Sequence, residues 1–143
     1  MEGGSQTMSG PAETIELLLK ATNSHDLDAL VARFAEDYVN ETPAHPARGF
    51  HGRAQVRRNW EQIFSFVPDL RAEVMRLTVD GDVVWTEWTM HGTRRDGTPH
   101  EMAGAIVFGV SDDLIRWARF YLEPVDRSDA NVDAAVRAQV ARQ

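Results

Sequence analysis

The sequence has no cysteine, no long run of apolar residues and no excess of basic residues. The absence of cysteine excludes disulfides, thiolate nucleophiles and cysteine-containing zinc sites. No segment reaches the roughly 20 apolar residues that a membrane-spanning helix needs. The net charge of −7, with Lys and Arg scattered along the chain, disfavours nucleic acid and anionic membranes as partners. We therefore expect a cytoplasmic protein that binds neither nucleic acid nor a membrane.

The chain contains enough apolar sequence for one domain, because 43% of its 143 residues are hydrophobic. Residues 1–11 contain neither an apolar run nor a basic lead, so we expect a disordered tail there. The domain itself is expected to span residues 12–125. Residues 126–143 are rich in Ala, Arg and Val and predict a weak C-terminal helix, with valines four apart at Val132, Val136 and Val140.

Helices are predicted in the first half of the domain. Apolar residues spaced three and four apart indicate one helix from Ala12 and a short second one from Leu27 to about Ala35. A third helix begins at Arg53 and soon ends because of a proline, Pro68. Between the second and third helices we expect a short strand from Tyr38, followed by a loop rich in Pro and Gly.

The second half of the domain consists of strand-like runs separated by short turns that contain Asp, Gly and Ser. Such turns join antiparallel neighbours, so these runs predict an antiparallel meander. Helices followed by a meander give an α+β fold, in which a curved antiparallel sheet wraps about three helices around an apolar pocket. The predicted strands cover residues 70–79, 83–94, 99–110 and 114–124.

Large aromatic residues are expected on both faces of this sheet, because successive strand residues point to opposite faces. Trp85, Trp117 and Tyr121 fall on the face away from the helices. An exposed aromatic patch usually marks an interface, so we predict a homodimer in which two such faces pack together. The alternative is that the terminal helix or neighbouring loops cover these rings.

Several segments match a known family in their order along the chain: YVNETP at 38–43, FVPDL at 66–70, GDVVW at 81–85 and RFYLEP at 119–124. With them, residues 12–125 resemble the SnoaL-like branch of the nuclear transport factor 2-like superfamily. The resemblance implies a cone-shaped α+β fold that is often dimeric. That superfamily includes polyketide cyclases, ketosteroid isomerases, limonene epoxide hydrolases and non-enzymatic binding proteins, so the fold alone does not give the function.

The polar residues of limonene epoxide hydrolases are only partly present. Tyr38 and Asn40 match the Tyr-x-Asn motif of those enzymes. The Asp-Arg-Asp set that completes their site falls on Trp88, Met90 and Phe120, which cannot act as acid or base. Epoxide hydrolysis is therefore the third choice among the functions that the resemblance implies.

Two of the family comparisons indicate the same candidate acid or base, Glu41. It takes the position of a His in SnoaL-type cyclases, and it is the nearest match to the general-base Asp of ketosteroid isomerases. If Glu41 faces the apolar pocket, desolvation raises its pKa toward neutrality, as proton abstraction beside a carbonyl requires. The alternative is a solvated rim carboxylate paired with Arg48 or Arg53.

Three further residues of this segment are candidates for orienting a ligand oxygen. His45 lies between prolines near the expected pocket mouth, where it either donates to a ligand and exchanges a proton near pH 7, or only orders the loop. Tyr38 and Asn40 alternate on the short strand and so share one face, from which both reach a bound oxygen. Their alternative role is structural.

The apolar wall of the pocket is predicted from the strand phase and the third helix. A filled core is the alternative for these residues, although Gly104 removes a side chain and leaves room for a ligand or a bend. His51, His91 and His100 lack the close spacing and the carboxylates of a metal site, so no metal is expected. The predicted ligand-binding residues are Trp60, Trp88, Met90, Met102, Gly104, Ile106, Phe120 and Leu122.

Together these residues favour a cofactor-free cyclase or isomerase that acts by proton transfer on a hydrophobic or polycyclic small molecule. Glu41 is the predicted base, and Tyr38, Asn40 or His45 orients an oxygen of the substrate. The second hypothesis is a non-catalytic binding or regulatory module of the same fold. It is supported by the uncharged residues that stand at positions where related enzymes carry charged ones.

Overall fold

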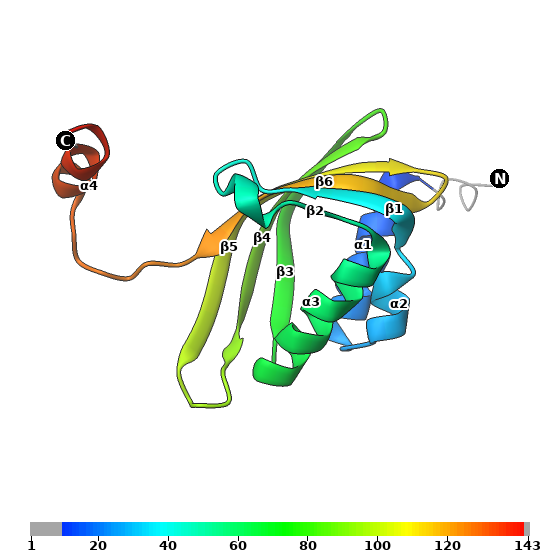
Figure 1. Cartoon of the computed structure of the whole chain (residues 1–143), viewed down its shortest axis with the longest axis horizontal. Coiled ribbons are helices and arrows are strands. Elements are labelled where there is room, and N and C mark those ends of the chain that lie inside the picture. Colours follow the sequence, from blue (N-terminus) through cyan, green and yellow to red (C-terminus); the bar gives the residue numbers. More distant parts are fainter. Residues whose placement is uncertain (1–9, 142–143) are drawn as a thin grey trace.

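The computed structural model describes residues 10–141. The predicted tail at residues 1–11 lies outside the described residues, except for Gly10 and Pro11. Figure 1 shows one curved sheet with helices α1, α2 and α3 gathered on one side of it, and a fourth helix, α4, set apart at the end of an extended segment. The α+β fold predicted from the sequence is confirmed.

The two N-terminal helices form where the local sequence favours them. α1 (Pro11–Asn23) begins with a proline, whose fixed φ suits the first helical turn, and Glu13 lies at the positive end of the helix dipole. α2 (Leu27–Val31) is capped by Asp26, whose carboxylate accepts a hydrogen bond of 3.1 Å from the Ala29 amide. Each helix buries an apolar side in the core.

The second helix ends earlier than predicted, because strand β1 (Phe34–Glu41) begins where the apolar spacing indicated helix. Leu30 and Phe34 are both buried, so the apolar pattern is satisfied in either conformation. Phe34 pairs with Ile115 of a distant strand, whose amide donates to the Arg33 carbonyl. These long-range contacts outweigh the weak tendency of such a short helix to extend.

One sheet contains all the described strands, in the order β2-β1-β6-β5-β4-β3. The predicted meander is confirmed, because β3 (Arg71–Asp80), β4 (Val83–Thr93), β5 (Pro99–Ser111) and β6 (Leu114–Pro124) pair antiparallel in sequence order. β2 (Phe50–His51) pairs antiparallel with β1. The expectation of a wholly antiparallel sheet is wrong at one place, since β1 pairs parallel with β6. A parallel pair needs a long connection, which α3 and the rest of the meander supply.

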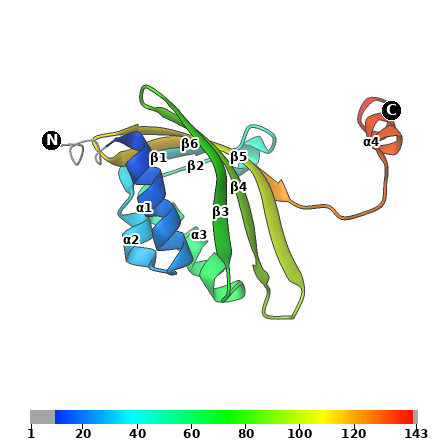
Figure 2. The ribbon, with the colours of Figure 1, turned by 180° about the vertical axis from the view of Figure 1, so that it is seen from behind.

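The helices divide the inner face of the sheet between them. α3 (Arg53–Phe66) contacts β1 and α2, whereas α1 packs mainly on β3. Figure 2 shows α1 beside β3, with α3 behind it. The core lies between the helices and the sheet, and its fully buried members include Ile15, Trp88 and Phe108. Met102 of β5 and Phe120 and Leu122 of β6 face the side of the sheet where α3 lies.

The outer face of the sheet exposes two of the three aromatic residues predicted there. Trp85 is 52% exposed and Tyr121 is 42% exposed, so no described residue covers their rings completely. Trp117 is half-buried. The homodimer therefore stays a prediction.

The predicted C-terminal helix is present as α4 (Val132–Val140), and Asn131 caps it by accepting a hydrogen bond of 3.0 Å from the Ala134 amide. Figures 1 and 2 both show this helix well away from the sheet. All of its residues are exposed. None of the helices within residues 10–141 has the length and hydrophobicity that a bilayer crossing requires.

Candidate functional site

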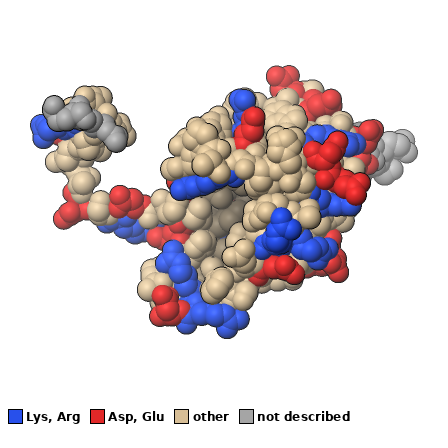
Figure 3. All heavy atoms as spheres, in the orientation of Figure 1, with Lys and Arg blue, Asp and Glu red and all other residues tan. Residues whose placement is uncertain are grey.

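A cavity of about 450 Å³ opens between α3, the β1–β2 segment and the inner face of β4, β5 and β6. Its volume lies in the range typical of small-molecule sites. Figure 3 shows a hollow on this side of the molecule, with basic side chains at its edge. Apolar side chains form most of the lining: Phe34, Phe50, Val56, Trp60, Ile63, Met90, Met102, Phe120 and Leu122.

Five of the eight predicted ligand-binding residues line this cavity, namely Trp60, Met90, Met102, Phe120 and Leu122. The register of the sheet explains this agreement. Met90 of β4 stands opposite Met102 of β5, so their side chains point to the same face. Phe120 and Leu122 alternate along β6 and share that face as well.

Trp88 and Ile106 do not line the cavity, because they belong to the filled core. Trp88 is 1% exposed, and its indole Nε1 donates to Thr86 Oγ1 at 2.6 Å. Thr86 Oγ1 donates in turn to the Ile106 carbonyl at 2.6 Å. The alternation of side chains along the strands predicted the correct face of the sheet for these residues. The space next to them is filled by other core side chains, so they do not line the cavity.

Gly104 also lies outside the cavity lining, and the structure gives a different reason for this glycine. Its φ of 148° belongs to a region that side chains rarely adopt, and a Cβ there would collide with the backbone of Tyr121 and Leu122. The close approach of β5 to β6 therefore needs a glycine. Gly104 thus does not open space for a ligand in this cavity.

Tyr38 and Asn40 form the polar part of the cavity on β1. The Tyr38 hydroxyl donates to Asn40 Oδ1 at 2.7 Å, and both residues are buried. Burial raises the pKa of the Tyr38 phenol far above its usual range, so the hydroxyl keeps its proton. Because Asn40 Oδ1 is occupied, its amide nitrogen is the group that remains to donate to a ligand oxygen.

Glu41 does not face the cavity. It follows Asn40 on β1 and points to the opposite side of the strand, where Oε1 lies 2.7 Å from Arg119 Nε. Both side chains of this pair are about half exposed, and Glu41 raises the pKa of Arg119. The expectation of a desolvated base is therefore wrong in its geometry. The solvated ion pair is correct, although its partner is Arg119 rather than Arg48 or Arg53.

His45 lies on the same outer side as Glu41. Its Nε2 is 3.2 Å from Glu123 Oε1, and it does not contribute to the lining of the cavity. The parallel register of β1 and β6 places Glu41 beside Arg119, so the loop that follows β1 reaches Glu123 farther along β6. Two of the four predicted catalytic residues thus bind β6 instead of facing the cavity.

Sequence reasoning missed four polar residues of the lining, which are Thr42, Arg48, Asn59 and His100. His100 had a detectable signal, because it stands two residues before Met102 on β5 and so shares its face. Partial burial lowers the pKa of His100, and the nearby Arg94 lowers it further. The imidazole is therefore mainly neutral at pH 7.

The charge in the lining is cationic. Within residues 10–141, Arg48 is the only permanently charged side chain that lines the cavity, and no carboxylate does so. Such a lining favours ligands that carry or develop negative charge on oxygen. No cluster of three or more metal-ligating side chains occurs in the part of the chain that the structure describes.

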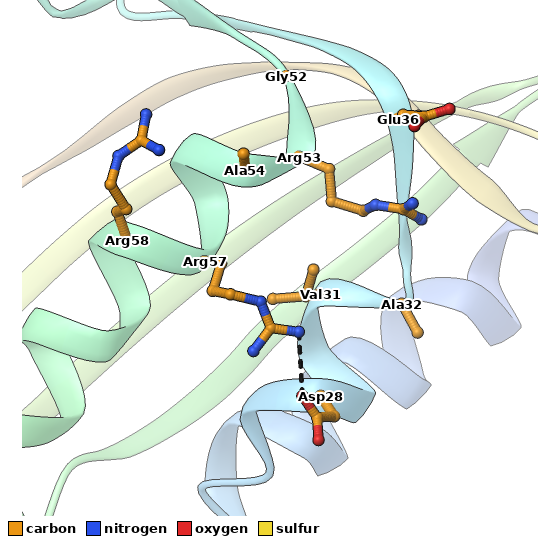
Figure 4. A pocket seen from close by; sticks show the side chains of 9 residues that line it. All are labelled: Asp28, Val31, Ala32, Glu36, Gly52, Arg53, Ala54, Arg57 and Arg58. Carbon is orange, nitrogen blue, oxygen red and sulfur yellow. Dashed lines mark hydrogen bonds and ion pairs between the residues drawn. The ribbon is translucent and has the colours of Figure 1, made fainter.

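A second hollow, of about 660 Å³, lies between α2 and the start of α3. Figure 4 shows that arginines from α3 dominate it, with Arg57 reaching toward Asp28. Arg57 donates to Asp28 Oδ1 at 3.0 Å, and Arg53 donates to the Phe34 carbonyl at 3.4 Å. These contacts join α3 to α2 and β1, so we assign this hollow a structural role.

Comparisons with known proteins agree with the fold. The SnoaL-like domain model matches residues 15–118. IdmH, a candidate polyketide cyclase from Streptomyces antibioticus, is 25% identical, with 92% of this chain and 99% of that chain covered and a TM-score of 0.67. A limonene epoxide hydrolase (LEH)-like enzyme of M. tuberculosis is 22% identical, with 79% and 82% covered and a TM-score of 0.68.

A third similar structure has a ketosteroid isomerase-like fold and comes from Catenulispora acidiphila, in complex with trimethylamine. It is 19% identical, covers 76% of this chain and 85% of its own, and has a TM-score of 0.66. At 22% and 19% identity, the second and third structures support the fold alone. No curated protein matches the chain.

Proposed function

The chain belongs to the SnoaL-like family, and we propose that it acts on a hydrophobic or polycyclic small molecule as a cofactor-free cyclase or isomerase. The likeness to IdmH, a candidate polyketide cyclase, supports a reaction of this general class. One observation carries the proposal: a cavity of about 450 Å³ is walled by apolar side chains and also presents a few polar groups. This combination is typical of sites that bind and orient a small molecule.

Cyclisation and isomerisation without a cofactor need a group that moves a proton and a donor that stabilises the oxygen where negative charge develops. The Asn40 amide, fixed by the Tyr38 hydroxyl at 2.7 Å, provides such a donor. Arg48 adds a positive charge to the same lining. We therefore propose that the carbonyl or phenol oxygen of the ligand lies toward β1, and that its rings pack between Trp60, Met102 and the rest of the apolar wall.

The second candidate function is binding without catalysis, and a specific observation favours it. Glu41 and His45, the two titratable residues that the family comparison and the loop position predicted, contact β6 instead of the cavity. Epoxide hydrolysis is the weakest of the three, because Met90 and Phe120 line the cavity at positions where limonene epoxide hydrolases carry charged residues.

Binding of 2-naphthol, a bicyclic phenol, provides the first test and is measured by its fluorescence. We expect one molecule per chain. Met102→Trp fills the cavity from β5 and is expected to weaken binding at least tenfold, whereas Val132→Ala on the distant α4 is the matched control and leaves it unchanged. Asn40→Ala removes one hydrogen bond to the phenol oxygen, worth about 1.4 kcal/mol or tenfold in affinity. Absence of binding, or binding that ignores Met102→Trp, would contradict the proposal.

Mass spectrometry of small molecules retained on purification then separates catalysis from binding. An enzyme is expected to convert a retained or related molecule into an isomer of equal mass, or a cyclised product, when the purified protein is incubated with it. The binding module would be supported instead by two results together: the retained molecule stays chemically unchanged, and Asn40→Ala weakens its binding.

A further inference from the structure

Among the residues that the structure describes, His100 is the one whose side chain both lines the cavity and is suited to accept a proton at neutral pH. It follows Pro99 at the start of β5 and stands opposite Gly92 of β4. It shares the inner face of the sheet with Met102, and it lines the cavity. It is half-buried, so its imidazole is partly removed from water but still accessible to a ligand.

The other titratable groups that face this space are poorly suited to the role. The Tyr38 phenol holds its proton because burial raises its pKa. Arg48 is a permanent cation. No carboxylate lines the cavity among the described residues, and Glu41 lies on the far side of β1 with Arg119. Among the described residues of the lining, the imidazole is therefore the side chain left that could accept a proton from a ligand.

The surroundings of His100 keep its lone pair available. Arg94, in the β4–β5 turn, donates to Thr98 Oγ1 at 3.1 Å and to the Pro99 carbonyl at 2.7 Å. These bonds hold a guanidinium next to the start of β5. Partial burial of the ring lowers the pKa of His100, and the charge of Arg94 lowers it further. An imidazole that is neutral at pH 7 serves as a base, whereas an imidazolium does not.

We propose that His100 is the proton acceptor of this cavity and that the substrate is a hydrophobic ketone with an acidic hydrogen on the carbon next to the carbonyl. A neutral imidazole nitrogen takes that proton. The C–H electron pair forms the carbon–carbon double bond of an enolate, and the carbonyl π pair moves to oxygen, where the Asn40 amide and Arg48 stabilise it. Return of the proton from the imidazolium to the opposite face of the same carbon gives an epimer of the ketone and restores the neutral ring.

The proposal rests on the proposed function, and 5-nitrobenzisoxazole tests it without knowledge of the natural substrate. A base takes the proton from C3 of this probe, the C–H pair completes a nitrile, the N–O bond breaks, and the oxygen leaves as a coloured phenolate. We expect wild-type protein to exceed the buffer rate, with kcat/KM rising with pH and levelling off below the ordinary histidine pKa of 6.5. His100→Gln is expected to lose about 100-fold of this rate.

Two variants provide the comparison. His91→Gln replaces an exposed histidine on the outer face of β4 and is expected to retain the wild-type rate. Glu41→Gln tests the rival base. Loss of the rate in Glu41→Gln rather than in His100→Gln would overturn the proposal.

The imidazole can also be observed directly in the wild-type chain, so the proposal remains testable if His100→Gln does not fold. In NMR spectra of ¹⁵N-histidine-labelled protein, 2-naphthol is expected to shift the His100 imidazole signal and its pKa, and to leave those of His91 unchanged. If 2-naphthol binds but leaves the His100 signal and the probe rate unaffected, the inference is wrong while the binding site stands. If 2-naphthol does not bind, both the inference and the proposed function are wrong.

Discussion

Replacing Tyr38 by Phe removes one hydroxyl group from the polar part of the cavity and leaves the ring in place. The lost hydroxyl donates to Asn40 Oδ1 at 2.7 Å, and Tyr38 is 1% exposed and Asn40 is 8% exposed. A net hydrogen bond contributes about 0.5 to 1.5 kcal/mol to stability, and an acceptor left without a partner costs about 1 to 3 kcal/mol. Asn40 borders the cavity, where water can replace the hydroxyl, so we expect the lower part of this range, about 1.5 kcal/mol.

Urea unfolding followed by circular dichroism measures this loss. With a slope of about 2 kcal/mol per molar urea, the midpoint is expected to fall by roughly 0.7 M. Asn40→Ala removes the other partner of the same bond and is expected to cost a similar amount. The double variant is then expected to be more stable than the sum of the two single losses predicts, by about 1 kcal/mol, because the bond is lost only once.

The functional consequence is separable from the structural one. Tyr38→Phe frees the Asn40 side chain to rotate, so affinity for 2-naphthol is expected to fall about threefold to tenfold even in protein that is fully folded. Two results would refute the reasoning. If the free energies of the two single variants add within about 0.3 kcal/mol, the two groups do not interact in solution. If Tyr38→Phe binds 2-naphthol as wild type does, the hydroxyl does not position the amide.

Three further predictions concern stability and assembly. Lowering the pH below about 6.5 is expected to destabilise the protein through His100. The pKa of His100 is lowered in the folded state, so the unfolded chain binds the proton more readily. This part of the pH dependence of urea unfolding should be absent in His100→Gln. Gly104→Ala is expected to cost roughly 2 kcal/mol or more of unfolding free energy, because a Cβ would collide with the backbone of β6. We propose the outer sheet face as a homodimer interface, so sedimentation at micromolar concentration should show a dimer for wild type and a monomer for Trp85→Lys.

The strands and turns of the meander were predictable because their signals are local. Alternating apolar residues and Asp-Gly turns fix β3 to β6 within a few residues of their observed bounds. The start of β1 was not predictable in this way. The spacing of Leu30 and Phe34 fits a helix, and only the pairing of Phe34 with Ile115, 81 positions later in the chain, selects a strand. The parallel direction of β1 follows from the same distant contact.

The site shows where the resemblance to a family misled and where strand phase would have corrected it. Tyr38 and Asn40 were placed on one face because alternate strand residues point the same way. The same rule places Glu41 on the other face, so Tyr38, Asn40 and Glu41 could not all line one cavity. His100 follows from the rule as well, since it shares the phase of Met102. Which part of the inner face stays open could not be predicted, because it depends on how α1 and α3 divide the sheet.

Glu41 and His45 have a role that this geometry makes clear, although neither lines the cavity. The loop after β1 contributes Thr42 and Arg48 to the lining. On its outer side the same segment is attached to β6 twice, by Glu41 to Arg119 at 2.7 Å and by His45 to Glu123 at 3.2 Å. Exposed polar contacts add little to global stability, but two of them, at the end of β1 and in the loop that follows, restrict the position of this segment. The two contacts therefore act on the rim of the cavity, by holding the segment that carries Arg48, the one permanent cation of the lining among the described residues.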